Sequence, residues 1–588
     1  MKKTVIALAL FAGMFASCKK VLDIDNINSY NPDQVWNDEN LANAYMANLY
    51  SAFGNWSASE DRFSEQLIGI ALPKDFVTVT NGNFKSWDYS RVRLVNQALV
   101  EVSKGKLSDN ARKGITGQAL FLRAFLYFNM VKYHGGVPYV KVPQDKDADD
   151  LAVPRNSTAE CFDFIIKDLD DAIALLPERI LSSSPDYGRI DGSFALAFKA
   201  KVLLYKASPQ FHSSNPWNNA DWATAYTVNK KAYDDLKARG YRLVDDYSNI
   251  ALVERGPETV FPVINQYPSK TAAWDNGVRP GSESRGPASA VPAWEMIKMF
   301  PMKDGKRYND PTSIYFKTDE QFLQSYWQNR DPRFDKSVVW SGKSYPVSGK
   351  LGKRLYTSLG IADVQDDFGT NPDAKTNSTN LDRYSGFFIL KNSLLRLTQA
   401  QVLQYDVDFV YMRFAEVMLN YAETANETGR PAEALDILKQ IRMRAGIEPG
   451  LDGNYGINAT DRATLREAIL TERNIELCFE GHRFWDLRRL RLLNRLDGTT
   501  KSGVEAIPIN TDGSNMPLDV ARNKANANEL TEVNFKYVLH QVPRSGVKVN
   551  TVPATYYFFP IHKDVLDRNP NLKQNIGWAD GTFNPTLD

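Results

Sequence analysis

Several common patterns are missing from this 588-residue sequence, and each absence excludes a class of protein. There are only three cysteines, Cys18, Cys161 and Cys478, and no CxxC pair, which excludes a zinc ribbon, a thioredoxin-type centre and a disulfide framework. Because Cys161 and Cys478 both lie in helical patterns, buried free thiols are expected there. The formal net charge is +1, from 71 Lys and Arg against 70 Asp and Glu, so the sequence predicts no basic surface for nucleic acid.

Catalytic and metal-binding motifs are also lacking. The five histidines are dispersed without an HExxH pattern, and neither GxSxG nor GxGxxG occurs. Segment 337–344 (SVVWSGKS) ends like a phosphate-binding loop, but Ser337 stands where the first glycine must be. No cofactor and no metal site is therefore predicted, and the histidines are expected to be structural or at the surface: His134, His212, His482, His540 and His562.

Beyond its first residues, the sequence has no apolar run long enough to span a membrane. The start combines two lysines, the apolar run Val5–Phe15 and small residues before Cys18, which predicts a signal peptide over residues 1–17. This arrangement resembles the lipobox of bacterial lipoproteins, where the signal is cut before an acylated cysteine, although Phe15 replaces the usual leucine. We therefore expect residues 18–30 to form a lipidated tether. Ordinary signal-peptidase cleavage beside a chance cysteine is the alternative.

Helical periodicity divides the rest of the chain into four parts. Residues 31–254 and 406–498 contain paired helical patterns, 255–405 is rich in Gly, Pro, Ser, Asn and aromatic residues, and 499–588 is loop-like. Helices are expected at 31–53, 90–102, 110–133, 157–176, 193–207 and 220–239, and short strands at 337–340 and 387–390. The pattern predicts a mainly all-α fold, in which a helix-pair scaffold carries a large loop-rich insertion. Because loops carry the sites on such scaffolds, 255–405 is expected to form the binding subdomain.

The stretch Asp408–Leu490 predicts a helix hairpin followed by a long third helix. One apolar stripe at helical spacing runs through Val410, Phe414, Val417, Met418 and Tyr421. Gly429 can end the first helix in a left-handed conformation, and Pro431 suits the first turn of the second. The short connection makes the two helices antiparallel neighbours.

Three carboxylates in the third helix, Glu472, Glu476 and Glu480, share one face at a spacing of four residues. Two such carboxylates could serve a glycoside hydrolase as acid and base. They continue an apolar stripe, however, and a buried carboxylate needs a partner. An internal ion network is therefore favoured, with these neighbouring arginines as candidate partners: Arg442, Arg444, Arg473, Arg483 and Arg488.

Several stretches together resemble the SusD/RagB family of outer-membrane nutrient-binding lipoproteins. The matching segments are Phe121–Pro138, Arg330–Phe334 (RDPRF), Tyr411–Gly429, Ala434–Gly446, Ile469–Arg489, Phe558–His562 (FFPIH) and Asn569–Trp578. They occur in order from the N-terminal part of the chain to its last dozen residues, so the resemblance extends over most of it. One departure is His134, which separates Tyr133 from the glycines of the family's Tyr-Gly-Gly turn.

The resemblance implies a tetratricopeptide-like scaffold with a looped binding subdomain and a function in nutrient capture. It implies a lipid-anchored protein at the outer-membrane surface that binds an oligosaccharide or polysaccharide and delivers it to a TonB-dependent, SusC-like transporter. It also implies that the protein is not an enzyme. The alternatives are peptide capture, as in RagB-like members, a glycoside hydrolase, or a purely structural helical-repeat scaffold.

Aromatic residues in the loops are the candidates for ligand contact. Pyranose rings pack their C–H faces on indole or phenol rings, while their hydroxyls need polar partners. The candidate residues are Trp56, Trp87, Asp75 and Asn81 in the first loop region, and Trp274, Asn276, Trp294 and Tyr315 in the insertion. Core packing is the alternative for each tryptophan, and the only modification predicted is lipidation of Cys18.

Overall fold

The computed structural model describes residues 32–69, 72, 75–145, 147–250, 253–286, 288–358, 361, 384–542 and 551–588. The predicted signal peptide, Cys18 and the tether before residue 31 lie outside these ranges. No helix in the described ranges combines the length and hydropathy needed to cross a bilayer. Within the same ranges, no three His, Cys, Asp or Glu side chains are grouped so as to hold a metal ion.

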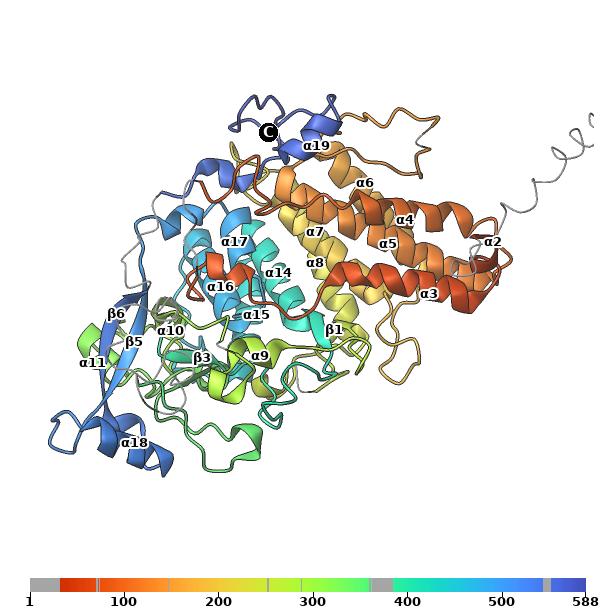
Figure 1. Cartoon of the computed structure of the whole chain (residues 1–588). Coiled ribbons are helices and arrows are strands. Elements are labelled where there is room, and N and C mark those ends of the chain that lie inside the picture. The colour runs from red at the N-terminus through yellow and green to blue at the C-terminus, as the bar shows by residue number, and fades with distance from the viewer. Residues whose placement is uncertain are drawn as a thin grey trace, which may run out of the picture.

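The fold is mainly helical, as predicted. The first group of helices comprises α2 (Pro32–Val35), α3 (Glu39–Leu49), α4 (Tyr89–Glu101), α5 (Asp109–His134), α6 (Thr158–Leu175), α7 (Gly192–Ala207) and α8 (Asp221–Ala238). The second group comprises α14 (Phe414–Glu427), α15 (Pro431–Ala445), α16 (Arg462–Glu476) and α17 (Arg483–Arg489). The two groups form one scaffold, because α14 packs against α8 as well as against α15 and α16 (Figure 1).

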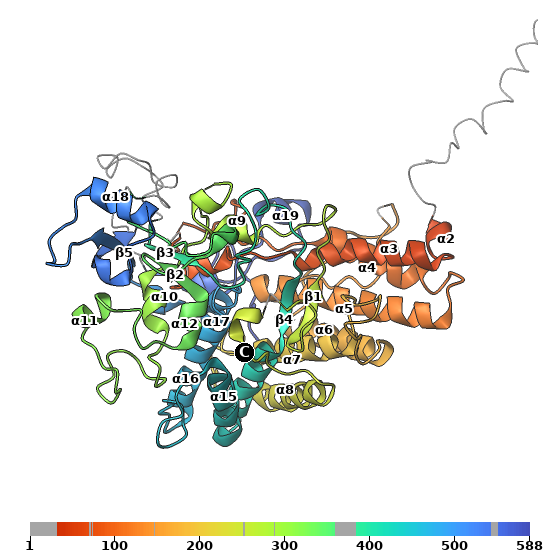
Figure 2. The same ribbon diagram turned by 90° about the horizontal axis from the view of Figure 1, so that it is seen from below.

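The insertion between these groups contains short elements. They are β1 (Thr259–Val263), α9 (Trp274–Val278), α10 (Trp294–Met299), α11 (Asp319–Leu323), α12 (Pro332–Ser337), β2 (Val338–Trp340), β3 (Phe387–Ile389) and β4 (Phe409–Arg413). The remaining helices and strands are β5 (Lys501–Pro508), α18 (Leu518–Asn526), β6 (Phe535–Val542) and α19 (Lys563–Arg568). Seen from below, the insertion lies together with β5 and α18 beside the scaffold helices (Figure 2).

Short 3-10 turns include η2 (Tyr50–Phe53), η3 (Glu60–Phe63), η4 (Tyr247–Asn249) and η10 (Leu493–Leu496). The strands form three separate two-stranded antiparallel pairs, β1 with β4, β2 with β3 and β5 with β6. The β2–β3 pair confirms the strands predicted at 337–340 and 387–390.

Local sequence signals explain the ends of the scaffold helices. Asp38 caps α3 by accepting hydrogen bonds from the N–H groups of Asn40 and Leu41 at 2.8 and 3.1 Å. Ser157 and Glu160 form a capping box at the start of α6. Gly429 follows α14 with φ +76°, and Pro431 opens α15, so the predicted hairpin turn is confirmed.

Two predictions for the stretch Asp408–Leu490 were wrong in detail. Residues 409–413 form the strand β4, which pairs with β1 before the helix begins. Their aromatic and β-branched residues favour a strand. The third helix is interrupted between α16 and α17, where Phe479 and Gly481 have positive φ. The interruption is held by the first loop region, since Gln66 accepts a hydrogen bond from the Phe479 N–H at 2.9 Å.

The segment predicted as loop after residue 499 contains the β5–β6 ribbon and α18, which corrects that prediction. The side chains of β6 alternate between buried and exposed at its start, Phe535 and Tyr537 inward and Lys536 outward. Residues 504–537 join the hydrophobic core of the insertion, together with Ile475, Cys478 and Phe479 of the scaffold. Residues 552–559 instead join the core of the scaffold. The end of the chain therefore contributes to both cores.

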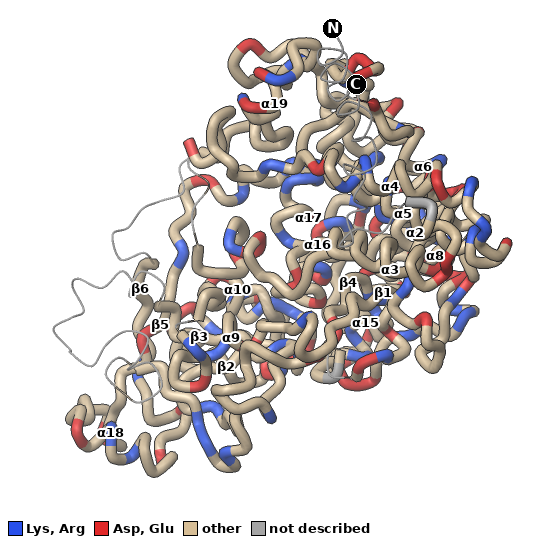
Figure 3. Tube along the Cα trace, turned by 45° about the vertical axis from the view of Figure 1, so that its right-hand side comes forward, with Lys and Arg blue, Asp and Glu red and all other residues tan. Residues whose placement is uncertain are grey.

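The distribution of charge and the state of the cysteines agree with the predictions from the sequence. Lys and Arg are interspersed with Asp and Glu along the described trace (Figure 3). Cys161 and Cys478 are buried and free, as predicted. Burial raises the pKa of the Cys161 thiol to about 12, so it stays protonated and unreactive.

Candidate functional site

The structure separates the candidate residues of the first loop region. Trp56 is half-buried and packs against Trp274 and Phe409, with ring centroids 5.8 and 4.8 Å away. Trp87 is half-buried elsewhere, 5.8 Å from the ring of His134 on the scaffold helix α5. Trp56 and Trp87 therefore keep part of their ring surface accessible, at different places.

The polar candidates of that region differ in what their side chains do. Asn81 folds its own loop, since its Nδ2 donates to the carbonyl of Phe76 at 3.0 Å and its Oδ1 accepts from the Thr78 N–H at 3.3 Å. Asp75 is exposed. In the insertion, Asn276 Oδ1 accepts from the Arg285 N–H at 2.9 Å, which fixes the neighbouring turn.

The remaining aromatic candidates are engaged within the protein. Trp274 and Trp294 are only 5 % and 4 % exposed and belong to the core of the insertion. The indole N–H of Trp274 donates to the Lys391 carbonyl at 3.1 Å. The phenol of Tyr315 is half-buried and donates to Glu448 at 2.8 Å. The expected pair of exposed platforms at Trp274 and Trp294 is thus absent from this structure, because both rings fill the core.

A different aromatic residue, Tyr267, presents an exposed ring. It lies at the tip of the loop 266–270, whose ends are joined by two backbone hydrogen bonds between Gln266 and Lys270, of 2.7 and 2.9 Å. The Tyr267 side chain is 55 % exposed and borders a groove of about 540 Å³. We call this the Tyr267 groove; it is lined by Tyr267, Arg396, Leu397, Ala400, Gln401, Gln404, Tyr405 and Asp406.

The polar side chains of the Tyr267 groove are available to a ligand. Arg396, Gln404 and Asp406 are exposed, and their side chains make no hydrogen bond or ion pair to any other described residue. They offer a guanidinium group, an amide and a carboxylate beside an aromatic ring. This combination gives one apolar face together with several donors and acceptors, which matches the two-sided chemistry of a sugar ring.

The base of the groove is fixed by a buried ion pair beneath it. Arg279 and Asp275 are fully buried and form a salt bridge of 2.7 Å. Arg279 also donates to the carbonyl groups of Leu394 and Leu397, at 2.5 and 2.8 Å. These bonds attach the segment that contains Arg396 to α9, so the groove has a rigid base.

Sequence reasoning missed Tyr267, although a signal was present. Residues 266–269 read Gln-Tyr-Pro-Ser, and proline beside small polar residues is typical of a turn at the surface. An aromatic ring at such a tip is exposed unless another segment covers it. The tryptophans were predicted as ligand platforms because their rings are large, but a large apolar ring is also suited to the core.

The glutamates of α16 and the residues that follow it form the predicted ion network. Glu472 and Glu476 are completely buried, and the Glu480 side chain is 11% exposed. Their partners are Arg333 and Arg442 for Glu472, Arg333, Arg413 and Arg444 for Glu476, and Arg413 and Lys391 for Glu480. Every one of these carboxylates is therefore committed to internal ion pairs.

Three partners in this network were not foreseen: Arg333, Arg413 and Lys391. Arg333 belongs to the RDPRF segment and reaches Glu472 at 2.6 Å, and Arg413 at the end of β4 reaches Glu476 at 2.7 Å. Both come from segments far from α16 in the sequence, so helix periodicity could not pair them. The network thereby joins the insertion to the second part of the scaffold.

Comparison with known proteins agrees with this architecture. A family model described as the SusD family matches residues 257–578, more than half of the chain. A second model, described as starch-binding and associating with the outer membrane, matches residues 16–204. The SusD-like protein P38 of Formosa agariphila is 23% identical over 525 residues, which cover 84% of this chain and 92% of that protein.

Solved structures share the fold. A SusD-like protein from Bacteroides fragilis NCTC 9343 has a TM-score of 0.70 at 24% identity, over 93% of this chain and 98% of that one. A SusD-like carbohydrate binding protein from the same strain has a TM-score of 0.70 at 20% identity, over 92% and 100% of the two chains. The family predicted from the sequence motifs is confirmed, and the chain belongs to the SusD family.

Proposed function

We propose that this protein captures oligosaccharides or polysaccharides at the outer membrane and passes them to a TonB-dependent transporter of the SusC type. The observation that carries the proposal is the Tyr267 groove, where an exposed ring lies beside polar side chains without partners. Family membership supports it, since a protein of the same fold is described as carbohydrate binding and the N-terminal family model as starch-binding.

The proposal contains no enzymatic step. The carboxylates that suggested a hydrolase are buried in ion pairs with arginines, and a buried, paired carboxylate can neither protonate a glycosidic oxygen nor activate water. Ligand contacts are also proposed for the candidates from the sequence whose side chains are not fully buried: Trp56, Trp87, Asp75, Asn81, Asn276 and Tyr315.

Tyr267→Ala is expected to weaken glycan binding about tenfold, which corresponds to roughly 1.4 kcal/mol. The substitution removes the only ring of the groove that is more than half exposed, while leaving the base of the groove in place. Affinity electrophoresis against a panel of polysaccharides identifies the ligand, and calorimetry measures the change. Tyr267→Phe keeps the ring and should retain most of the affinity.

An affinity equal to wild type in the Tyr267→Ala variant would show that the groove is not the platform. Binding of unstructured peptides in place of any glycan on the panel would favour the peptide-capturing alternative. Release of reducing ends from a bound polysaccharide would contradict the proposal that the protein is not an enzyme.

The membrane tether is proposed to be the acylated Cys18. Cys18→Ala should move the protein from the membrane pellet to the soluble fraction and abolish incorporation of labelled palmitate. Cys161→Ala is the matched control, because the Cys161 thiol is buried and free. This variant is expected to stay in the membrane pellet. Protease treatment of whole cells tests surface exposure, and co-purification from detergent extracts tests the transporter partner. Acylation of the Cys18→Ala variant would refute this tether.

A further inference from the structure

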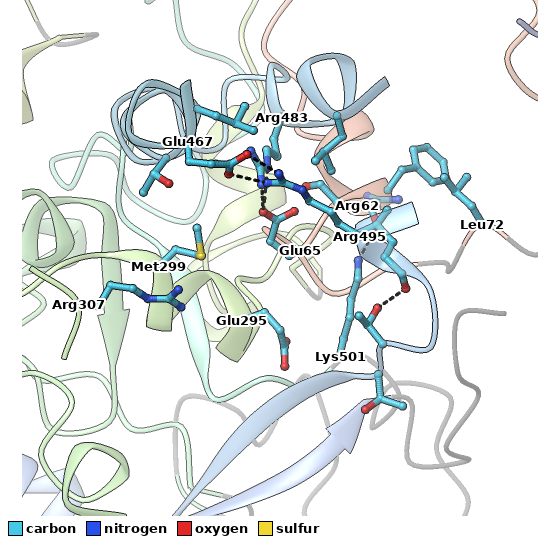
Figure 4. Close-up of a pocket in the computed structure, with 18 residues that line it drawn as sticks. Arg62, Glu65, Leu72, Glu295, Met299, Arg307, Glu467, Arg483, Arg495 and Lys501 are labelled. Carbon is cyan, nitrogen blue, oxygen red and sulfur yellow. Dashed lines mark hydrogen bonds and ion pairs between the residues drawn. The ribbon is translucent and has the colours of Figure 1, made fainter. Parts of the chain in front are cut away.

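A second cavity lies between the scaffold and the insertion. It has a volume of about 320 Å³ and is bounded by the loop after η3, by α10, α16 and α17, and by residues 499–501 (Figure 4). A cavity of this size is at the lower end of the range for small-molecule sites. We call it the arginine pocket, because Arg62, Arg307, Arg483 and Arg495 line it.

The arginine pocket contains a buried guanidinium nitrogen without a partner. Arg483 is only 5 % exposed, and its Nε and Nη2 contact the same oxygen of Glu65, at 2.8 and 2.5 Å. Its Nη1 is buried and has no hydrogen-bond acceptor among the described residues. A buried donor of a charged group is costly when left unpaired, so this N–H is a built binding position for an acceptor.

An unpaired acceptor lies beside this donor. Asn474 also donates to Glu65 Oε1, at 3.5 Å, so all the contacts of Glu65 converge on one oxygen. Glu65 Oε2 is buried and has no donor among the described residues. Although burial alone would raise the pKa of Glu65, the charge of Arg483 and its hydrogen bond lower it, so the carboxylate is ionised and needs a donor.

The lining as a whole carries an excess of positive charge. Five arginine and lysine side chains face three carboxylates. Arg495 is paired with Glu467 at 2.6 Å, but Arg307 is exposed and has no ion pair among the described residues. Figure 4 shows Arg307 on the opposite side of the pocket from Arg483 and Glu65. Burial lowers the pKa of Lys501 to about 8, although Glu295 and Glu65 act to raise it.

We propose that the arginine pocket binds a uronate unit of the glycan, with its carboxylate on Arg483 Nη1 and Arg307 and a hydroxyl on Glu65 Oε2. A uronate supplies both missing partners, because its carboxylate accepts from guanidinium groups and its hydroxyls donate to a carboxylate. A neutral hexose would satisfy the hydrogen bonds but leave the excess charge unpaired. The inference rests on the proposed glycan-binding function and adds a preference for acidic saccharides.

The test compares a glucuronate-containing oligosaccharide with the glucose oligosaccharide of the same length, by calorimetry on the mature chain. Wild type should bind the acidic ligand more tightly, and Arg307→Ala should lower that affinity by about 10- to 100-fold while leaving the neutral ligand unaffected. Because Arg307 is exposed, the variant is expected to fold. Lys303→Ala is the matched control, since it removes a nearby exposed charge that does not line the pocket.

Each outcome bears on one of the two proposals. Equal affinity for the acidic and neutral ligands, or an acidic affinity unchanged by Arg307→Ala, would overturn the uronate site. Competition by inorganic sulfate at the same concentration as glucuronate would likewise overturn it, because the pocket would then hold any anion. Binding of the neutral oligosaccharide alone counts against this inference only, whereas absence of all glycan binding counts against the proposed function itself.

Discussion

Replacing Glu476 with glutamine is expected to lower the free energy of unfolding by about 3–5 kcal/mol, the usual cost of removing one side of a buried ion pair. The Glu476 carboxylate is completely buried and receives Arg333 at 2.9 Å and Arg413 at 2.7 Å. Glutamine keeps the shape of the side chain and removes its charge, so Arg333 and Arg413 each lose one of the buried carboxylates that compensate their charge. Chemical denaturation followed by circular dichroism measures the change.

The exposed ion pair between Lys563 and Asp567 provides the matched control. These side chains are each 56 % exposed and lie 2.6 Å apart. Asp567→Asn should therefore change the free energy of unfolding by about 0.5 kcal/mol or less. A similarly small change for Glu476→Gln, together with the loss of a glycan-cleaving activity, would contradict the structural role of Glu476 and restore the hydrolase alternative.

Wild type and the Glu476→Gln variant should also differ in how their stability depends on pH. Burial alone would raise the pKa of Glu476, but the charges of three arginines hold it well below its ordinary value of 4.5. A carboxylate with a lowered pKa stabilises the folded state above the pKa of the unfolded chain, and this contribution is lost as the pH falls. Wild type should therefore lose stability below about pH 4.5 more steeply than Glu476→Gln.

Local signals in the sequence predicted the scaffold well, because a helix end depends on residues within one turn of it. Asp38, the Ser157–Glu160 capping box and the Gly429–Pro431 turn all act over a few residues, and the turn was predicted and confirmed. The elements that were missed depend on partners far along the chain. The strand β4 exists because β1 pairs with it, and the interruption before α17 is held by Gln66.

In the ion network too, the local pattern was predictable and the partners far along the chain were not. The shared face of Glu472 and Glu476 follows from helix geometry, and it correctly indicated buried carboxylates. The identity of their partners does not follow, because Arg333 and Arg413 come from an insertion and a strand whose positions are set by the whole fold. A residue pattern can show that a partner is needed without showing which segment supplies it.

The candidate site was harder to predict than the fold. A ring can contact a ligand only if it is exposed, and the sequence pattern does not show which aromatic rings are exposed. Tryptophan in a loop-rich sequence is compatible with a sugar platform and with the core of a small subdomain. In this protein the core of the insertion is assembled from short elements, so it depends on large aromatic side chains to fill the space between them. Trp274 and Trp294 serve that purpose, and the smaller Tyr267 remains at the surface.

Trp294→Ala is therefore expected to lower the free energy of unfolding by about 3–5 kcal/mol, as for other large aromatic side chains removed from a core. Its indole is 4 % exposed and packs near Phe322, Tyr326 and Phe387, with ring centroids 5.5 to 6.2 Å away. Thermal and chemical denaturation measure the loss.

Tyr267→Ala is the control, because it removes an exposed ring of the proposed binding surface and leaves the core of the same subdomain intact. Its ring is more than half exposed, so the free energy of unfolding should change by about 0.5 kcal/mol or less while glycan affinity falls. Trp294→Ala should show the reverse, with lost stability but unchanged affinity in the fraction that remains folded. The opposite assignment, a stable Trp294→Ala variant with weakened binding, would require the indole to leave the core when ligand binds. Comparing both variants therefore tests whether the binding surface is already formed in the free protein.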